Sequence, residues 1–254
     1  KTVQTGSLYN QALIKKINCY TWDFINQDFK LIFSKNKVAH EQQISDEMWK
    51  NISIINLSVS EKDQVKQFME RKIKFFNKHH ENNYKNLEIE KSYLKKKIGI
   101  KNENQIISIF PNLDHDSSVF GIGDVYENLY QFLEGMIELS NEFKNYNFVL
   151  RTHPGGLSKN KYTKSTMPLN EYINCNLYSK LRSNFYIINP EEKISSYSLA
   201  HISKHRIVYS STLGLEFPYM RLKTIVASNA YYKYKGFSID PRSHTELVDI
   251  IKKD

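Results

Sequence analysis

The sequence predicts an α/β fold whose C-terminal part is a parallel β-sheet covered by helices on both faces. Two observations carry this prediction. From residue 105 onward, short apolar runs alternate with segments of helical periodicity, as in successive β-α units. The runs are continuously apolar, which is typical of parallel strands buried on both faces. Alternation of this kind indicates a Rossmann-like domain.

The expected elements of this domain follow one another in a regular order. Strands are expected at 105–110, 147–151, 185–188, 206–209 and 224–227. Helices are expected at 125–143, 169–181, 195–203, 211–220 and 245–252. Pro111 ends the first strand, because proline lacks the backbone N–H that a strand ladder needs.

The chain before residue 105 predicts two less regular parts. Residues 1–58 are expected to form a partial α/β domain, and residues 59–104 a helical connector. Within residues 1–58 we expect a strand at 29–33, a helix at 39–51 and a strand at 52–57. Within the connector we expect a helix at 89–98 that ends at Gly99. The connector begins with Ser60 and Asp63, spaced as a capping pair. The chain starts at Lys1 without an initiator Met, which leaves open that its N-terminal domain is incomplete.

Composition limits the classes of function. The 254 residues are 40% hydrophobic and 25% charged, as in ordinary globular proteins. The net charge of +9 is dispersed, so solvated helix faces explain most of it. A basic surface also suits a nucleotide phosphate, an acidic glycan or an anionic membrane face. No zinc spacing, aromatic RNA-binding motif or long basic run is present, so a nucleic-acid partner is not expected.

Cysteine usage and hydropathy predict the compartment. Cys19 and Cys175 lie far apart and predict no disulfide framework, so a reducing, cytoplasmic environment is expected. No apolar run is long enough to span a membrane, and no signal peptide is evident. Peripheral association with the inner face of the membrane remains open.

Three groups of polar residues follow predicted strands directly, at the sheet edge where open α/β sheets bind ligands. The first contains Arg151, His153 and Pro154, followed by two glycines that let the backbone approach a ligand. Arg151 could clamp an anion, and His153 could donate to a phosphate. The alternative is an ordinary strand-to-loop turn.

The second group opens a helix after the strand at 206–209. Ser210, Ser211 and Thr212 supply hydroxyl donors at a helix start, a common place for anions. Glu216 lies one turn further on the face of Thr212, so it could accept from ribose hydroxyls or from Thr212 itself. Simple capping by Ser211 is the alternative, and it is compatible with phosphate binding.

The third group follows the first strand of the domain. Asp114 and Asp116 flank a histidine there and could act as base, nucleophile or acceptor contact. An acidic turn is the alternative. A metal site is not expected, since alternating loop residues need not converge and no further ligands are evident. A fourth segment, residues 231–237, is aromatic and basic, and could cover a base or lie on the surface with its lysines extended.

At these residues the sequence resembles bacterial capsule polysaccharide biosynthesis proteins, a group that includes β-Kdo transferases. The likeness lies in Phe110-Pro111-Asn112 with Asp116-Ser117, Arg151-Thr152-His153-Pro154, Ile194-Ser195-Ser196-Tyr197-Ser198, Tyr209 through Glu216, and Lys235-Gly236-Phe237. It covers residues 105–240 well and the first hundred only loosely. The stretch 217–221, with Pro218, departs from the small residues that often follow the glutamate.

The resemblance implies a GT-B fold and a glycosyltransferase that uses a nucleotide-activated sugar, often CMP-linked, without a metal cofactor. The N-terminal part would face a glycan or glycolipid acceptor. The implied catalytic residues are Asp116, Asp114 and His153. The implied nucleotide- and phosphate-binding residues are Arg151, His153, Pro154, Ser210, Ser211, Thr212, Glu216, Lys235 and Gly236. Three alternatives stay open: a sugar-nucleotide epimerase, a polyol-phosphate transferase, and a non-catalytic relative that binds nucleotide or glycan.

Overall fold

A computed structural model describes residues 3–24, 31–37, 44–78, 87–113, 124–157 and 167–253. The chain forms two compact units, residues 1–54 and residues 55–254, and each is described by itself. All of the polar groups singled out in the sequence belong to the second unit.

The described residues of the first unit form two helices and a pair of antiparallel strands. Helix α1 (Val3–Ile14) precedes the antiparallel strands β1 (Tyr20–Phe24) and β2 (Leu31–Lys35), and α2 (Asp46–Ser53) follows. Strand β2 corresponds to the strand expected at 29–33, and α2 to the helix expected at 39–51; residues 29–30 and 39–43 lie outside the described residues. The strand expected at 52–57 is wrong. The apolar run at 52–57 contains the end of α2, and the residues after the helix form no strand. An apolar run does not by itself distinguish a strand from other buried segments.

The connector consists of α3 (Val59–Lys78) and α4 (Leu87–Ile98). The capping pair at the start of α3 is Ser58 with Glu61, two residues before the expected pair. The Ser58 hydroxyl accepts from the Glu61 backbone N–H at 3.2 Å, and the Glu61 carboxylate accepts from the Ser58 N–H at 2.8 Å. Gly99 ends α4 as expected, with a φ of +88° that suits glycine.

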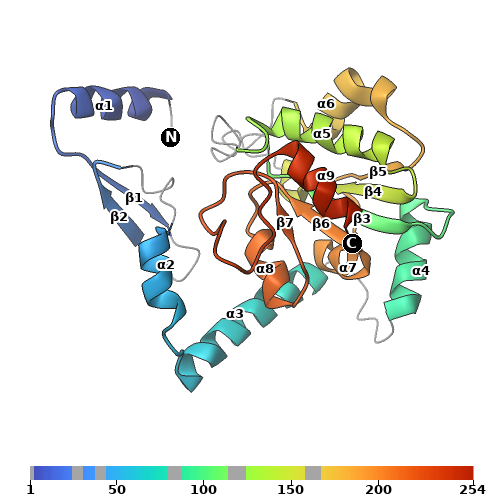
Figure 1. The fold of residues 1–254 in the computed structure, drawn as a ribbon, viewed down its shortest axis with the longest axis horizontal. Helices are drawn as coiled ribbons and strands as arrows, with labels where there is room; N and C mark the ends of the chain where they lie inside the picture. The colour runs from blue at the N-terminus through green and yellow to red at the C-terminus, as the bar shows by residue number, and fades with distance from the viewer. Residues whose placement is uncertain are drawn as a thin grey trace. The chain divides into compact units, whose positions relative to one another are not determined.

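The second unit contains a parallel five-stranded sheet in the order β5-β4-β3-β6-β7 (Figure 1). The strands are β3 (Gln105–Phe110), β4 (Tyr146–Arg151), β5 (Phe185–Ile188), β6 (His205–Val208) and β7 (Ile225–Val226). Every neighbouring pair is parallel, and central β3 places Ser108 opposite both Val149 and Arg206. The predicted strands are confirmed, with ends shifted by at most a residue.

Helices follow the strands as the alternation predicts. They are α5 (Leu129–Glu142), α6 (Leu169–Tyr172), α7 (Ser196–Ile202), α8 (Leu213–Tyr219) and α9 (His244–Lys252). The helix expected at 169–181 is irregular, because α6 passes into a π-helical turn (Ile173–Leu177) and a 3₁₀ turn (Tyr178–Lys180). A short 3₁₀ turn (Pro154–Leu157) follows β4.

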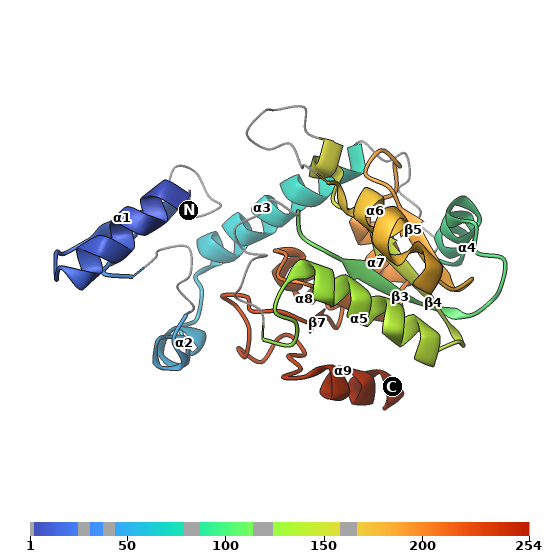
Figure 2. The ribbon, with the colours of Figure 1, turned by 90° about the horizontal axis from the view of Figure 1, so that it is seen from above.

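Both faces of this sheet are covered. Ile107, Ile109 and Leu150 point to one face, where they pack against α5, the α6 segment and α9. Ile106 and Val149, one position away, pack on the opposite face against α4, α7 and α8. Figure 2 shows α5 and α9 on one side of the sheet and α4 and α7 on the other. The predicted class, a parallel sheet covered by helices on both faces, is confirmed.

The strand order places a topological switch point between β3 and β6. From β3 the chain adds β4 and then β5 on one side, and it returns to add β6 and β7 on the other side. The connections after β3 and β6 therefore leave the sheet in opposite directions. A crevice forms at the carboxyl ends of two strands with this arrangement, and open α/β sheets bind ligands there.

Candidate functional site

Asn112 bridges the switch point. It lies two residues beyond β3 and is 7% exposed, and its side-chain oxygen accepts from the backbone N–H of Ser210, just beyond β6, at 3.2 Å. This hydrogen bond joins the ends of the two strands that flank the crevice. The Ser210 hydroxyl is buried beside it and has no hydrogen-bond partner among the described residues. A polar group in such a position needs a partner, and an anionic ligand would supply one.

The turn between β6 and α8 is held from two sides. The Ser211 hydroxyl accepts a hydrogen bond from the Leu213 backbone N–H at 3.3 Å. The N-cap residue of α8 is Thr212, however, and its side chain makes no capping hydrogen bond, so N-capping by Ser211 is not observed. The Tyr232 hydroxyl donates to the Ser211 carbonyl at 2.5 Å. Gly214 allows this contact, because a Cβ there would collide with the Tyr232 ring. The loop after β7 thereby fixes the shape of the turn.

Glu216 is the centre of a buried network. Its side chain is 7% exposed, and the Thr212 hydroxyl donates to its Oε1 at 3.0 Å, which confirms the contact expected from their spacing. Oε2 accepts from the Tyr197 hydroxyl at 2.6 Å. Oε1 also accepts from Lys72 Nζ of α3 at 2.5 Å, and this contact was not anticipated.

The network satisfies the buried carboxylate and perturbs its neighbour. Burial, followed by the charge of Glu216, raises the pKa of the Tyr197 hydroxyl above its ordinary value of 10.0, so this hydroxyl stays protonated and donates. A carboxylate has about four acceptor positions, and three are occupied here. One acceptor position on Oε2 has no hydrogen-bond partner among the described residues.

His153 is exposed at the carboxyl end of β4. Its Nδ1 accepts a hydrogen bond from the Gly155 backbone N–H at 2.9 Å. The His153 carbonyl accepts from the Gly156 N–H at 2.9 Å and closes the turn with Pro154 at its first corner.

Arg151 has a different role from the anion clamp considered above. It is 2% exposed, and its guanidinium donates to four backbone carbonyls, those of Thr152, Asn189, Glu192 and Ile194, at 2.7–3.1 Å. Burial lowers the pKa of this guanidinium to about 10, which leaves it charged near neutral pH. With its donors engaged, Arg151 ties the loop after β5 to the end of β4. We assign it to the support of the site and not to ligand contact.

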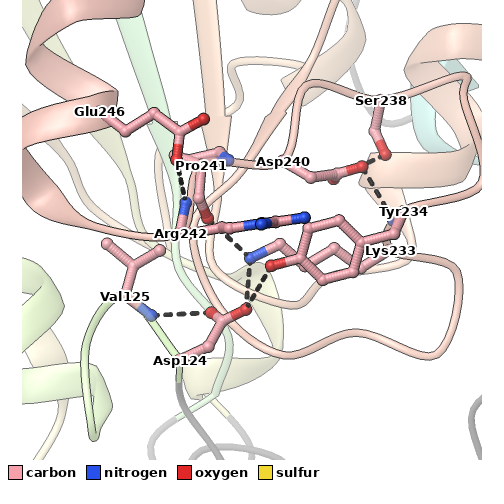
Figure 3. Close-up of polar contacts among 9 residues, drawn as sticks. All are labelled: Asp124, Val125, Lys233, Tyr234, Ser238, Asp240, Pro241, Arg242 and Glu246. Atoms are coloured by element: carbon pink, nitrogen blue, oxygen red, sulfur yellow. Dashed lines mark hydrogen bonds and ion pairs between the residues drawn. The ribbon is translucent and has the colours of Figure 1, made fainter.

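An ion pair joins Lys233, in the aromatic-basic loop after β7, to Asp124, which precedes α5 (Figure 3). The Lys233 side chain is 0% exposed, so it does not extend along the surface. Its Nζ donates to Asp124 Oδ2 at 2.6 Å and to the Pro241 carbonyl at 3.1 Å. Lys235, in the same loop, is 8% exposed, and Gly236 has a φ of +86°. Through Asp124 the loop is fastened to the start of the α5 segment.

The two acidic candidates, Asp114 and Asp116, lie outside the described residues, so their roles stay predictions. Among the residues that are described, no group of three or more His, Cys, Asp or Glu side chains could hold a metal ion. The described part of the chain likewise contains no helix with the length and hydropathy needed to cross a membrane.

Cavities lie at two places on the described part of the second unit. A narrow one of about 10 Å³ lies at the sheet edge, lined among others by Asn112, Thr152 and His153. A larger one of about 370 Å³ lies near the start of β3, lined mainly by Lys91, Lys95, Lys96 and Lys101. Lys95 and Lys96 lie in the last turn of α4, where the helix dipole favours cations, and Lys95 also donates to the Glu103 carboxylate. The smaller cavity holds about one water-sized sphere, and its lining residues follow β3, β4 and β5 and not β6. The candidate site is therefore defined by its polar side chains and not by a cavity.

Several residues of the site were missed from sequence. Tyr197 belonged to a resembling motif but had no expected role, and Lys72 had none. Tyr232 and Lys233 were expected only as part of the segment 231–237, which could cover a base or lie on the surface. Lys72 and Glu216 are 144 positions apart, and Lys233 and Asp124 are 109 apart. No local pattern signals contacts at such separations. Asn112 carried a usable signal, since it directly follows the strand-ending Pro111.

Comparison with known proteins gives likeness in fold only. No protein-family model matches the chain, and no curated protein matches it in sequence. A UDP-GlcNAc 2-epimerase from Neisseria meningitidis, bound to UDP-GlcNAc, is 14% identical with a TM-score of 0.42; the match covers 66% of this chain and 42% of the epimerase. KpsC of Thermosulfurimonas dismutans, a β-Kdo 2,7 transferase, is 15% identical with a TM-score of 0.38; the match covers 70% of this chain and 52% of KpsC.

The second of these structures is a β-Kdo transferase, the group that the sequence motifs resemble. The chain spans 42% and 52% of the lengths of the two enzymes. Similarity of this degree carries no conclusion about activity. The fold class of the second unit rests on its own parallel sheet and on the helices that cover both faces.

Proposed function

We propose that this chain is a glycosyltransferase of the GT-B type that uses a nucleotide-activated sugar, with a CMP-sugar favoured, to build a surface polysaccharide or glycolipid. One observation carries the proposal. The polar residues after β3 and β6 meet at the switch point of the sheet, where the Asn112–Ser210 hydrogen bond spans the crevice. Nucleotides commonly bind at this position in open α/β sheets.

The described side chains suit a phosphate and a ribose. The hydroxyls of Ser210 and Ser211 and the imidazole of His153 would contact the phosphate and would stabilise the charge that develops on it. The Thr212 hydroxyl, which the motif also offers, already donates its hydrogen to Glu216. The remaining acceptor position of Glu216 suits a ribose hydroxyl, as the motif resemblance implies. The CMP preference rests on that resemblance alone.

The reaction would displace the nucleotide from the anomeric carbon of the sugar. The acceptor hydroxyl oxygen forms the new bond to that carbon, and the bond from the carbon to the phosphate oxygen breaks. The electron pair stays on the departing phosphate, and the hydroxyl proton passes to a base. Asp116 or Asp114 is expected to be that base.

A thermal-shift screen tests the nucleotide site. CMP, CDP, UMP, UDP, GDP and CDP-glycerol are added to the whole chain, because a ligand that binds only the folded state raises the melting temperature. Ser210→Ala is the sharpest variant, since its hydroxyl has no partner among the described residues and its loss costs no known protein contact. His153→Ala and Ser211→Ala accompany it, and Ser92→Ala, at an exposed position of α4, is the matched control.

We expect one nucleotide to raise the melting temperature of the wild type and of Ser92→Ala, with a smaller shift in the three site variants. Product analysis with the corresponding nucleotide sugar then separates the alternatives: transferred glycosyl groups, epimerised sugar, or transferred phosphoryl groups. Binding without turnover would favour a non-catalytic relative. If the folded wild type responds to none of the nucleotides, the proposal is wrong.

A further inference from the structure

Lys72 of α3 lies at the head of α8, beside the hydroxyls proposed to bind phosphate. Its Nζ and the Thr212 hydroxyl donate to the same carboxylate oxygen, Glu216 Oε1, at 2.5 Å and 3.0 Å. The two donors are therefore close neighbours. Lys72 comes from the connector, which the sequence motifs do not include.

Glu216 holds this ammonium group in place. The carboxylate is 7% exposed, whereas the Lys72 side chain is 28% exposed, so the pair lies where the protein interior meets solvent. The Lys72 ammonium also lies 5.5 Å from the centre of the Phe68 ring on the same helix. An ammonium group has three donors, and Glu216 is its only hydrogen-bond partner among the described residues. Two donors remain for an anion.

Two other strong bases near this sheet edge are committed to the protein. Arg151 donates to four carbonyls, and Lys233 donates to Asp124 and Pro241 from a side chain that is 0% exposed. Lys235 is 8% exposed. A nucleotide phosphate brings negative charge into the crevice, and the Lys72 side chain, at 28% exposed, is more accessible than those of Arg151, Lys233 and Lys235.

We propose that Lys72 is a phosphate-binding residue of this site, positioned by Glu216. The inference rests on the proposed function and adds a group that neither the motifs nor the comparisons assign. Glu216 would then have two roles. It would accept a hydrogen bond from a ribose hydroxyl, and it would hold the Lys72 ammonium group near the phosphate. Helix α3 thereby becomes part of the nucleotide site.

The test compares a nucleotide with its nucleoside. Calorimetric binding is measured with the nucleotide that binds in the thermal-shift screen, for example CMP, and with the matching nucleoside, cytidine. We expect Lys72→Met to weaken nucleotide binding by about ten- to a hundredfold, the typical contribution of a hydrogen bond to a charged group. Nucleoside binding should be unchanged, and Lys72→Arg should restore most of the nucleotide affinity.

Lys66→Met is the matched control. Lys66 lies on the same helix with a side chain that is 65% exposed, and its loss removes one charge without touching the site. We expect it to leave both affinities unchanged. Lys72→Gln retains a donor for Glu216 without the charge, and it replaces Lys72→Met if circular dichroism shows that the methionine variant does not fold.

Other results would overturn the inference. Equal loss of nucleotide and nucleoside affinity would make Lys72 a structural support of Glu216. A gain in both would make it a competitor for the ribose position. If the wild type binds nucleotide and Lys72→Met keeps the same preference over nucleoside, the inference fails while the proposed function stands. If the wild type binds no nucleotide, both fail together.

Discussion

Removal of the Asp124 carboxylate should destabilise the protein more than removal of its partner Lys233. The two ends of this ion pair differ in burial, since the Lys233 side chain is 0% exposed and that of Asp124 is 33% exposed (Figure 3). Asp124→Ala leaves a charged ammonium group in the interior, with the Pro241 carbonyl at 3.1 Å as its remaining hydrogen-bond partner among the described residues. Lys233→Met removes the buried charge and leaves a carboxylate that water can reach.

The expected magnitudes follow from this difference. Breaking a buried pair so that a charge stays uncompensated costs about 3–5 kcal/mol, which we expect for Asp124→Ala. In Lys233→Met, Asp124 keeps the Val125 backbone N–H at 2.8 Å and the Tyr234 hydroxyl at 3.2 Å. That variant should lose only about 1–2 kcal/mol, the scale of a net hydrogen bond to a charged group.

Urea unfolding followed by circular dichroism measures both changes, and the double variant completes a thermodynamic cycle. Combining the two substitutions should cost less than Asp124→Ala alone, because the unpaired ammonium is then absent. The reasoning is refuted if Lys233→Met is as damaging as Asp124→Ala, or if the two effects simply add.

Three further predictions concern the site. Gly214→Ala should destabilise the protein by about 1–2 kcal/mol in urea unfolding, because the collision with Tyr232 outweighs a helix-propensity gain of about 1 kcal/mol; a stabilised variant would contradict the packing. Tyr197→Phe should reduce the loss of stability above about pH 10. Burial and Glu216 raise the pKa of the Tyr197 hydroxyl in the folded protein. The hydroxyl therefore contributes its full stabilisation below its pKa in the unfolded chain, and this stabilisation is lost as pH rises through its pKa in the folded protein. An unchanged dependence of stability on pH in Tyr197→Phe would argue against this role. Arg151→Met should cost about 2–4 kcal/mol of unfolding free energy while calorimetry shows unchanged nucleotide affinity in the folded variant; the opposite result would restore the anion clamp.

Local features of the fold were predictable because each is encoded within a few residues. Strand β3 has the predicted limits, since its apolar run is bounded by polar residues on one side and by Pro111 on the other. Gly99 ends α4 through a backbone conformation that glycine favours. The contact of Thr212 with Glu216 followed from helical spacing. The errors were also local: the capping pair of α3 shifted by two residues, and an apolar run at 52–57 paired with no strand.

The candidate site was predictable in part. The motifs placed His153 and the serines after strands, and the parallel sheet does bring the ends of β3, β4 and β6 to one edge. The sequence did not reveal that the Arg151 guanidinium donates hydrogen bonds to four backbone carbonyls, because the fold brings the loops that carry most of these carbonyls next to Arg151. A motif specifies a residue type, whereas the surrounding backbone decides which of its donors remain available.

The sequence by itself determined the alternation of strands and helices, the burial of the sheet on both faces, and the position of polar residues after strand ends. Only the tertiary structure decided that β6 lies beside β3, that this order creates a switch point at Asn112 and Ser210, and that Lys72 reaches Glu216 across 144 positions. The physical reason is the distance along the chain over which each kind of interaction acts. Periodicity and capping act between neighbours in the chain, while strand order and ion pairing follow from packing the whole domain.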